Sequence, residues 1–533
     1  LTTKMLYILL IVVILYFYYM RKFQYFSQRN IKHESPVPIF GNHTKVFFAR
    51  RTNIETACYL YKKYSDEKYV GYYRGTNPEI VVRDPDLVKY ILSENFLVFP
   101  NRGVKRDPKI EPLMLNMLSE EGDAWKLLRT NLSPAFSSSR IKSMFPIVVD
   151  YAEKFVKIAH NLAMEEKEFD AYIFTARFTI DLIGACGFGI DMNAINNEQS
   201  LFIKLRDYMF IKSKLQMILF GVYDLFPQSL INKVPLLKPQ VRDIIMEILH
   251  SVRSHRQHGD TQQNDFINIL LELGKVGKLT GDSLETDDTG KYKQAEIEFD
   301  NNRIAAQLFI YFIAGFETSS TTMSYAMHQL AHHPEIQQEV QKEIDTILAK
   351  HDGRLCYESV SEMLFLEMVV KESLRLFPPA GLTTRASPKD CTLPGINGTI
   401  KTGTRITIPI HALHMDETYF DNPEEFDPKR FSNESSQPRH KYAYIPFGEG
   451  PRKCIGTRAL SSLAKALLSN FSQTAMEKAD LLGCLFTFNW TLDYQGSHHR
   501  PFRGVILRCS KSYSGLRAVR KTLSSLDLYL TGA

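Results

Sequence analysis

Residues 447–456 read Phe-Gly-Glu-Gly-Pro-Arg-Lys-Cys-Ile-Gly, and this stretch decides how the chain folds. The glycines at 448, 450 and 456 let the backbone approach something flat, and they leave amides free to donate hydrogen bonds to a sulfur atom. Such a stretch could also be a glycine-rich turn beside a buried cysteine, with no functional role. Here, however, Phe, Gly, Arg, Cys and Gly stand at five defined offsets, with Cys454 at the start of a helical run.

This pattern resembles the haem-binding loop of the cytochrome P450 family, Phe-x-x-Gly-x-Arg-x-Cys-x-Gly. The resemblance implies that Cys454 is the axial ligand of the iron of haem b, and that Phe447, Arg452 and Gly456 belong to the cofactor site. An anionic thiolate pushes electron density onto the iron and favours O–O cleavage, and nearby hydrogen-bond donors tune its basicity. A neutral histidine ligand would not do this.

Glu372 and Arg375 lie on a predicted helix that ends at Pro378 and Pro379, and the i, i+3 spacing puts both side chains on one face. Alone, such a pair is usually a solvated contact of about 0.3 kcal/mol. Downstream, the sequence Phe-Asp-Pro-Lys-Arg-Phe offers Arg430 between aromatic residues. The resemblance implies that Glu372, Arg375 and Arg430 form a buried charge network that supports the segment before the haem loop, a structural role.

A second remote motif, Ala-Gly-Phe-Glu-Thr-Ser at residues 314–319, lies in the apolar helical stretch 304–330. Alone, it could be a helix kink whose Thr hydroxyl bonds back to its own backbone. It resembles the family's central helix, which crosses the distal haem face. The resemblance places Ala314 at the cofactor and implies that Thr318 holds water and orients oxygen while Glu317 relays protons.

Trp125 and Arg129 are four residues apart and share one face of a predicted helix. Elsewhere the default would be an interface aromatic residue beside a solvated Arg. In the family such a helix meets a haem propionate, and Arg385 and Arg452 match the family's other propionate-binding arginines. The forked guanidinium suits a carboxylate.

These motifs run from Trp125 to Cys454 and must converge on one porphyrin, so we expect one catalytic domain over 46–510 although the length of 533 residues would allow several. We expect a mainly α fold with small β-sheets, in which residues 80–82 and 406–408 are strand-like. The polar stretch 274–302 has little hydrophobic periodicity and is predicted to be a solvated loop.

The N-terminal residues 5–20 form a charge-free apolar stretch followed by Arg21 and Lys22. No small-residue cleavage site follows it, which favours an uncleaved membrane anchor over a cleaved signal peptide. Residues 21–45 form a basic linker with a proline-rich hinge at 36–42. The flanking basic residues favour a catalytic body on the cytosolic side, and the resemblance implies that the membrane is that of the endoplasmic reticulum. The sequons at Asn42, Asn131 and Asn433 would then be unused.

The net charge of +6 does not call for a nucleic-acid partner, and seven cysteines without a Cys-x-x-Cys pair indicate neither a disulfide scaffold nor structural zinc. The resemblance implies that electrons come from NADPH through a flavoprotein, NADPH–cytochrome P450 reductase, with cytochrome b5 as a further electron donor. A basic docking face for the reductase is predicted from four residues: Arg129, Arg140, Lys142 and Lys453.

Residues 132–136, Leu-Ser-Pro-Ala-Phe, look like the insect xenobiotic-metabolising branch, clan 3 and family 6-like. The match weakens beyond Arg458. Ala459 stands where the family usually has an aromatic residue, and residues 467–471 come four positions early, about one helical turn. The region from Thr474 onward resembles the family's C-terminal hairpin poorly, and residues 511–533 form an atypical Ser/Arg-rich tail.

The resemblance implies a monooxygenase that inserts one oxygen atom from O2 into a small lipophilic substrate, such as a xenobiotic, a plant toxin, an insecticide or an endogenous lipid or hormone. Two alternatives stay open. One is a reductase-independent, peroxide-rearranging haem enzyme, against which the intact Glu317-Thr318 pair argues. The other is a catalytically impaired haem or lipophile binder, which would show no reductase-dependent turnover.

Overall fold

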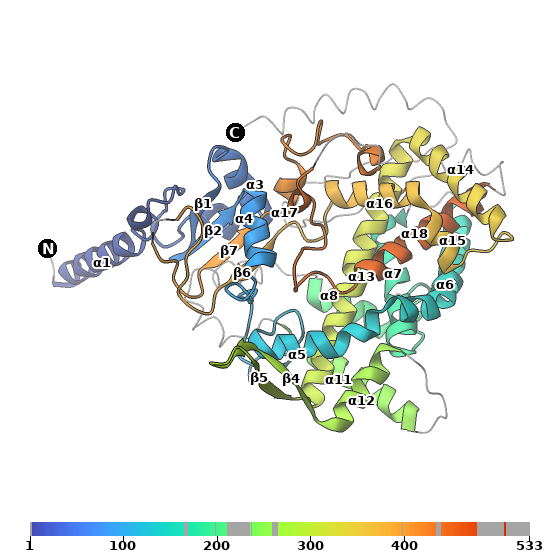
Figure 1. Cartoon of the computed structure of the whole chain (residues 1–533), viewed down its shortest axis with the longest axis horizontal. Helices are drawn as coiled ribbons and strands as arrows, with labels where there is room; N and C mark the ends of the chain where they lie inside the picture. The colour runs from blue at the N-terminus through green and yellow to red at the C-terminus, as the bar shows by residue number, and fades with distance from the viewer. Residues whose placement is uncertain are drawn as a thin grey trace.

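A four-stranded sheet lies at one side of the molecule and helices make up most of the rest, as Figure 1 shows. The structure is a computed structural model that describes residues 3–476, apart from 49, 165–168, 198, 211–234, 236, 258–264, 397 and 433–438, together with 506–507. The expected mainly α fold with small β-sheets is confirmed.

The central element is the long helix α13 (Asn301–His332), which runs through the middle of the helical region (Figure 1). It begins at Asp300, whose side chain accepts a hydrogen bond from the amide of Arg303. At about 1.5 Å per residue, its 32 residues make a helix about 48 Å long. The helix predicted over 304–330 is therefore confirmed.

Two apolar clusters meet on α13. The first includes Leu128, Ile180 and Phe312, and the second includes Phe178, Met323 and Leu467. The helices that supply or surround these clusters are α5 (Gly122–Leu132), α6 (Ser138–Met164), α7 (Ala171–Ile183), α8 (Leu201–Phe210), α11 (Pro239–Gln257), α12 (Phe266–Val276), α14 (Pro334–Lys350), α15 (Tyr357–Glu362), α16 (Leu364–Leu376) and α18 (Thr457–Met476).

The sheet has the strand order β1-β2-β7-β6. Its strands are β1 (Tyr69–Arg74), β2 (Asn77–Val82), β6 (Thr383–Ala386) and β7 (Arg405–Ile408). Strands β2 and β7 pair in parallel with Ile80 opposite Ile406, so both strand-like segments expected from the sequence are confirmed. The short helices nearby are α3 (Asn53–Lys63), α4 (Pro85–Lys89) and α17 (Ile410–His414).

The N-terminal helix α1 (Thr3–Lys22) projects away from the body (Figure 1). Two helical stretches of the described residues are long and apolar enough to cross a membrane, Lys4–Arg29 and Ala171–Phe188. The second is mostly buried in the core, as expected for an internal helix, whereas the first is not buried at all. The segment that follows α1 packs on the sheet through Phe26 and Ile31, and α2 (Thr44–Phe47) comes next.

The prediction of a solvated loop over 274–302 is wrong. Strands β4 (Lys278–Thr286) and β5 (Tyr292–Glu298) form an antiparallel hairpin that packs on α5. Its contact face alternates along β4, with Leu279 and Ser283 buried, Gly281 half-buried, and Thr280 and Asp282 exposed between them. Because the charged outer face dominates the composition, it conceals this two-residue period.

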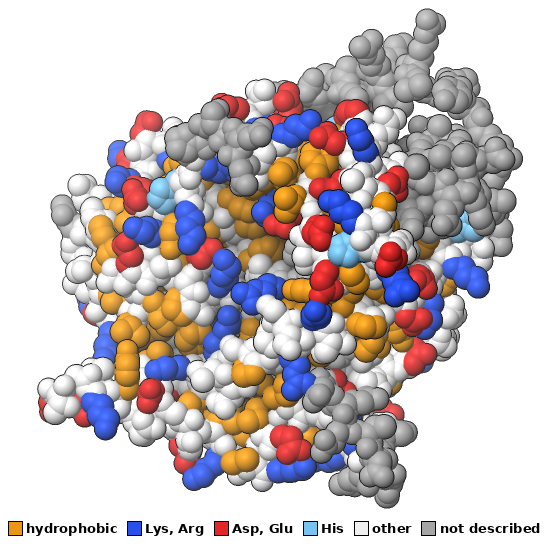
Figure 2. All heavy atoms as spheres, turned by 45° about the vertical axis from the view of Figure 1, so that its right-hand side comes forward, with side chains coloured by type: hydrophobic (Ala, Val, Ile, Leu, Met, Phe, Trp, Pro, Cys, Tyr) orange, Lys and Arg blue, Asp and Glu red, His pale blue; other side chains and the backbone are white. Residues whose placement is uncertain are grey.

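A short pair of strands, β3 (Phe169–Asp170) and β8 (Ile506–Leu507), joins distant parts of the chain. The atypical tail at 511–533 lies outside the described residues. Figure 2 shows a face of the molecule on which basic and acidic side chains lie next to one another around hydrophobic patches, as the small net charge would suggest.

Candidate active site

The loop before α18 holds Cys454 in a tight series of turns. The amide of Gly448 donates to the Ile445 carbonyl at 2.9 Å, and the amide of Cys454 donates to the Phe447 carbonyl at 2.9 Å. Gly450 has φ +77°, and a Cβ there would lie 1.8 Å from the Leu92 carbonyl oxygen. Only glycine fits at that position, so the loop can pass this close to η2 (Tyr90–Glu94) and present Cys454 at the end of the turn.

A cavity of about 230 Å³ lies between this loop and α13. Cys454 and Gly456 line it from the loop, and Ala314 and Thr318 line it from α13. The structure therefore brings together two pairs of residues about 140 positions apart in the sequence: Ala314, Cys454 and Gly456, which were predicted at the cofactor, and Thr318, which was predicted to orient oxygen. The remaining lining is largely apolar and includes Met117, Leu132, Phe136, Phe145, Leu182, Ile183 and Phe266, and Ala459 also contributes to it.

Glu317 and Thr318, the predicted catalytic pair, have different surroundings. Thr318 lines the cavity, and its hydroxyl donates to the Ala314 carbonyl at 2.6 Å, one turn earlier in the same helix. Glu317 is not among the residues that line the cavity. Its carboxylate accepts a hydrogen bond from the Tyr172 hydroxyl on α7 at 2.6 Å. Burial raises the pKa of Glu317, and the Tyr172 hydrogen bond opposes this shift only in part.

Arginines predicted to bind propionates gather near the loop. The Arg452 guanidinium lies 4.3 Å from the ring centre of Trp125, and one of its nitrogens donates to the Glu120 carbonyl at 2.8 Å. Arg385 is fully buried at β6. Burial lowers the pKa of Arg129, whereas its electrostatic interaction with Cys454 raises it. Phe447 is partly buried against the second apolar cluster.

Arg102 was missed by the sequence reasoning. One of its nitrogens donates to the Arg452 carbonyl at 3.1 Å, and another donates to the Thr383 hydroxyl at 3.3 Å. It reaches this position because Asn101 forms a bridge with Ala386 of β6. No motif surrounds Arg102 in the sequence, so only the three-dimensional arrangement identifies it.

Three arginines, Arg102, Arg385 and Arg452, interact with one another electrostatically. Among the described residues, no carboxylate lies within ion-pair distance of Arg102, Arg385 or Arg452. Burial, and then the charges of Arg102 and Arg452, lower the pKa of Arg385 well below its usual value. Burial and Arg102 lower the pKa of Arg452 to about 9, although Glu121 and Glu120 act in the opposite direction.

Buried nitrogens of these three arginines also have no hydrogen-bond partner among the described residues, namely Nε of Arg102, Nε of Arg385, and Nε and Nη1 of Arg452. Unpaired buried donors and cations are costly, and anionic oxygens are the ligands that satisfy them best. The two propionates of a haem whose iron meets Cys454 fit this requirement.

A second buried charge network lies behind the loop. The Arg375 guanidinium forms two hydrogen bonds of 2.7 Å with the carboxylate of Glu372, and both side chains are fully buried. Arg430 Nε lies 3.4 Å from Glu372 Oε1, an ion-pair contact. The structure therefore places Glu372, Arg375 and Arg430 together, as the sequence predicted.

His414 connects this network to the haem loop and was also missed. Its Nε2 accepts a hydrogen bond from the Ile445 amide at 3.1 Å, and its carbonyl accepts one from Arg375 Nη1 at 3.0 Å. Burial lowers the pKa of His414 to about 3, so the imidazole is neutral. A histidine 31 residues before Ile445 carries no motif signal, because its role depends on the path of the backbone.

Comparison with known proteins gives the family to which this fold and this site belong. A family model described as cytochrome P450 matches residues 32–481, and the chain therefore belongs to the cytochrome P450 family. This family implies a haem cofactor and monooxygenase chemistry.

Relatives from insects place the chain near P450s of type 6. Cytochrome P450 6a2 of Drosophila melanogaster is 35% identical over 457 residues, which cover 82% of this chain and 86% of the relative. Probable cytochrome P450 6a13 of the same species is 31% identical, with coverage of 91% and 95%. Cytochrome P450 6B1 of Papilio polyxenes is 33% identical, with coverage of 82% and 86%. The predicted resemblance to the insect branch is confirmed.

Proposed function

We propose that this P450 inserts one oxygen atom from O2 into a small lipophilic substrate, with electrons that NADPH supplies through a partner flavoprotein reductase. The observation that carries the proposal is the position of Cys454 and Thr318 on one apolar cavity with buried, unpaired arginines close by. Haem, when bound there, supplies an iron centre that activates O2. Cys454 would be its thiolate ligand, and Trp125, Arg129, Arg385 and Arg452, together with Arg102, would hold its propionates.

The side chains around the cavity suit this chemistry. Aliphatic and aromatic residues such as Phe136, Ile183 and Phe266 exclude water and favour a lipophilic substrate. The Thr318 hydroxyl lies at the cavity wall, where it can position a water molecule after its bond to the Ala314 carbonyl loosens. Glu317 can exchange a proton with this region from the Tyr172 side of α13.

Electron delivery requires a docking surface near the loop. Of the four basic residues predicted there, Lys453 forms an ion pair with Glu449 at 2.8 Å, and Lys142 forms one with Glu358. Arg129 is half-buried and interacts with Cys454, so it belongs to the site more than to a surface. We therefore assign reductase docking mainly to Lys142, Lys453 and Arg140, with cytochrome b5 as a further electron donor.

We further propose that α1 anchors the protein in the endoplasmic reticulum membrane with its body in the cytosol. The described sequons support this orientation. The Asn42 side chain accepts a hydrogen bond from the Tyr73 amide at 2.7 Å and donates one to the Ser35 carbonyl at 2.9 Å. The Asn131 side chain donates to the Leu127 carbonyl at 2.9 Å. A glycan on Asn42 would substitute Nδ2, the atom that donates to the Ser35 carbonyl. Asn433 lies outside the described residues.

The carbon monoxide difference spectrum of the reduced protein tests the proposal. We expect a thiolate-type Soret shift that Cys454→Ala abolishes, and NADPH-dependent turnover once reductase is added. Thr318→Ala should retain the spectrum while NADPH consumption becomes uncoupled from product formation. A normal spectrum with turnover that needs no reductase would contradict the proposed electron supply, and the absence of a thiolate signal would contradict the site itself.

A further inference from the structure

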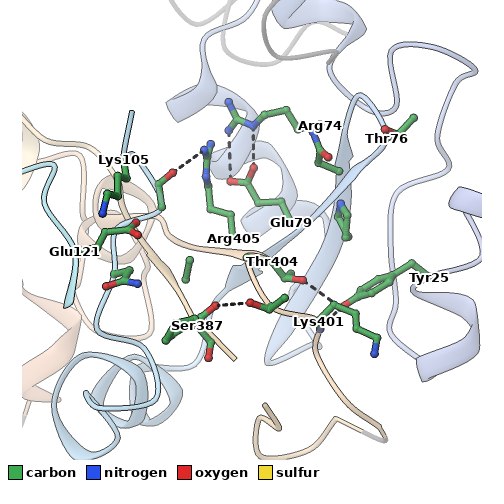
Figure 3. A pocket seen from close by; sticks show the side chains of 18 of the residues that line it. Tyr25, Arg74, Thr76, Glu79, Lys105, Glu121, Ser387, Lys401, Thr404 and Arg405 are labelled. Atoms are coloured by element: carbon green, nitrogen blue, oxygen red, sulfur yellow. Dashed lines mark hydrogen bonds and ion pairs between the residues drawn. The ribbon is translucent and has the colours of Figure 1, made fainter. Parts of the chain in front are cut away.

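A second, polar cavity of about 630 Å³ opens beside the sheet at the end of α1 (Figure 3). Lys22, the last residue of α1, and Tyr25 line it on one side. Arg74 and Glu79 line it from β1 and β2, and Arg405 lines it from β7. We call this cavity the anchor cleft. It is separate from the cavity of Cys454, because the two share no lining residue.

Positive charge exceeds negative charge in the anchor cleft. Five cations line it, since Lys105 and Lys401 join the three already named, and its lining carboxylates are Glu79 and Glu121. Glu79 is fully occupied: Arg74 Nε lies 2.9 Å from its Oε2, and the Thr407 hydroxyl donates to Oε1. Burial alone would raise the pKa of Glu79, but Arg74 and Arg405 outweigh it and hold the pKa at about 2.

The other cations leave donors for a ligand. Lys401 is paired with Asp390, and Lys105 lies 4.0 Å from Glu120 with about half of its side chain exposed. The Arg405 guanidinium makes one long hydrogen bond, of 3.4 Å, to the Gly103 carbonyl. Burial raises the pKa of Glu121, and Lys105 and Arg452 oppose this shift. Figure 3 shows Arg405 between the Lys105 side of the cleft and the Arg74–Glu79 pair.

The surroundings of the cleft point to a membrane surface. The helix α1 ends at Lys22, on the rim of the cleft, and its apolar stretch is not buried by the protein. The turn after it exposes Val37 and Ile39. This turn is fixed to β1, because the amide of Asn42 donates to the Tyr73 carbonyl at 2.7 Å, one residue before Arg74. An apolar helix, exposed apolar side chains and a cationic cleft therefore share one end of the molecule.

We propose that the anchor cleft binds the phosphate of an anionic phospholipid headgroup in the membrane that holds α1. The inference rests on the proposed anchoring by α1 and is independent of the reaction at Cys454. The Arg405 guanidinium matches phosphate oxygens in shape and charge, whereas Lys22 and Lys105 contribute point charges at the rim. Tyr25, whose hydroxyl lies 3.3 Å from that of Thr404, adds a polar wall. Basic residues that adjoin a membrane helix attract anionic lipids.

The test uses the full-length, haem-loaded protein in phosphatidylcholine nanodiscs that contain a small fraction of spin-labelled phosphatidylserine. Electron paramagnetic resonance gives the fraction of labelled lipid that is immobilised, relative to spin-labelled phosphatidylcholine. We expect the wild type to immobilise phosphatidylserine preferentially. Lys22→Gln combined with Lys105→Gln, which alters two rim side chains and leaves the core intact, should lower this preference severalfold. Arg405→Lys, which keeps the charge but loses the fork, should lower it less.

The matched control is Lys429→Gln, which removes an exposed lysine that pairs with Glu339 and does not line the cleft. An equal loss of preference in this control would overturn the site in favour of general charge attraction, as would a wild type without preference. Displacement of the labelled lipid by millimolar inorganic phosphate would assign the cleft to a soluble phosphate and overturn the lipid. Failure of the wild type to enter nanodiscs would overturn the anchoring itself, whereas the carbon monoxide spectrum reports the haem site separately.

Discussion

Two buried groups of charge lie near the haem loop, and they differ in how they are balanced. In the network of Glu372, Arg375 and Arg430, the carboxylate is paired by a two-bond contact with one arginine and an ion pair with the other. In the cluster of Arg102, Arg385 and Arg452, no described carboxylate is within ion-pair distance, and several N–H groups have no partner. Both arginines of the first group have a carboxylate partner within the protein, whereas the second group has none among the described residues and would favour an anion.

From this difference we infer that the first group has a structural role and that the second group binds a ligand. A buried ion pair whose members also bond to the backbone fixes the positions of the segments it joins. Arg375 bonds to three carbonyls in two such segments, those of His414, Pro423 and Glu425. A buried cluster of like charges makes the empty site less stable and favours whatever neutralises it. The first group should therefore govern folding, and the second should govern how tightly haem is held.

The largest effect is expected from Glu372→Gln. This change leaves the buried Arg375 without its anion, and breaking a buried pair on one side costs about 3–5 kcal/mol. The free energy of unfolding of the apoprotein, from urea titration, should fall by this amount. Glu367→Gln is the control, because Glu367 lies on the same helix but is partly exposed between Lys371 and Lys465. Equal effects of the two changes would contradict a special role for the network.

Arg385→Met should have the opposite pattern: little or no loss of apoprotein stability, but weaker haem binding. It removes a fully buried cation that has no carboxylate partner, so the apoprotein should be as stable as the wild type or more stable. Loss of a charge-assisted contact with a propionate should weaken haem binding by about 1.5–3 kcal/mol, roughly 10–100-fold. Transfer of haem to apomyoglobin measures its release.

Arg303→Met is the matched control for Arg385→Met, because Arg303 is paired with Glu120 at 2.7 Å. Its removal should destabilise the apoprotein. A clear destabilisation of the apoprotein by Arg385→Met would show that this cluster is structural, and the comparison between the two groups would fail.

The sequence predicted much of the paired group and only part of the unpaired one. Glu372, Arg375 and Arg430 belong to motifs with fixed spacing, and so do Trp125 and Cys454. Arg102 and His414 carry no such signal, because a bridge to β6 and the backbone path before Ile445 bring them into place. The hairpin of β4 and β5 was missed because charged residues on its outer face conceal the alternation of Leu279 and Ser283.

The predicted pairing of Glu317 with Thr318 shows a further limit of sequence reasoning. Adjacent side chains on a helix point about 100° apart, so they cannot share one face. The structure shows that Thr318 faces the cavity and Glu317 faces Tyr172, but the motif alone does not indicate which of the two faces the cavity.

A pH titration sharpens the role of His414 in the paired network. Its pKa is lowered by burial to about 3, below its usual value near 6.5 in the unfolded chain. The unfolded state therefore binds more protons between these values, and stability falls as pH drops below about 6.5, by up to about 1.4 kcal/mol per pH unit. His414→Gln should reduce this slope by up to one proton, as measured by urea unfolding at pH 5–7. The exposed His250 provides the control variant, and equal slopes for wild type and His414→Gln would contradict the assignment.

The smallest effect is expected at Glu317, which belongs to neither group because its partner Tyr172 is a neutral hydroxyl. Their hydrogen bond lowers the pKa of Glu317 against the effect of burial, so Tyr172→Phe should raise that pKa further. If Glu317 relays protons to the cavity, the pH profile of coupling between NADPH consumption and product formation should move to higher pH. The solvent isotope effect on turnover should change with it.

The control for this change is Tyr61→Phe, which removes a hydroxyl bonded to Asp416 at the same distance of 2.6 Å but far from the cavity in the sheet cluster. A merely structural role for Tyr172 would lower stability in both variants and leave the pH profile of coupling unmoved. A shift in Tyr172→Phe alone, with unchanged haem retention, would show that a single neutral contact sets the proton supply.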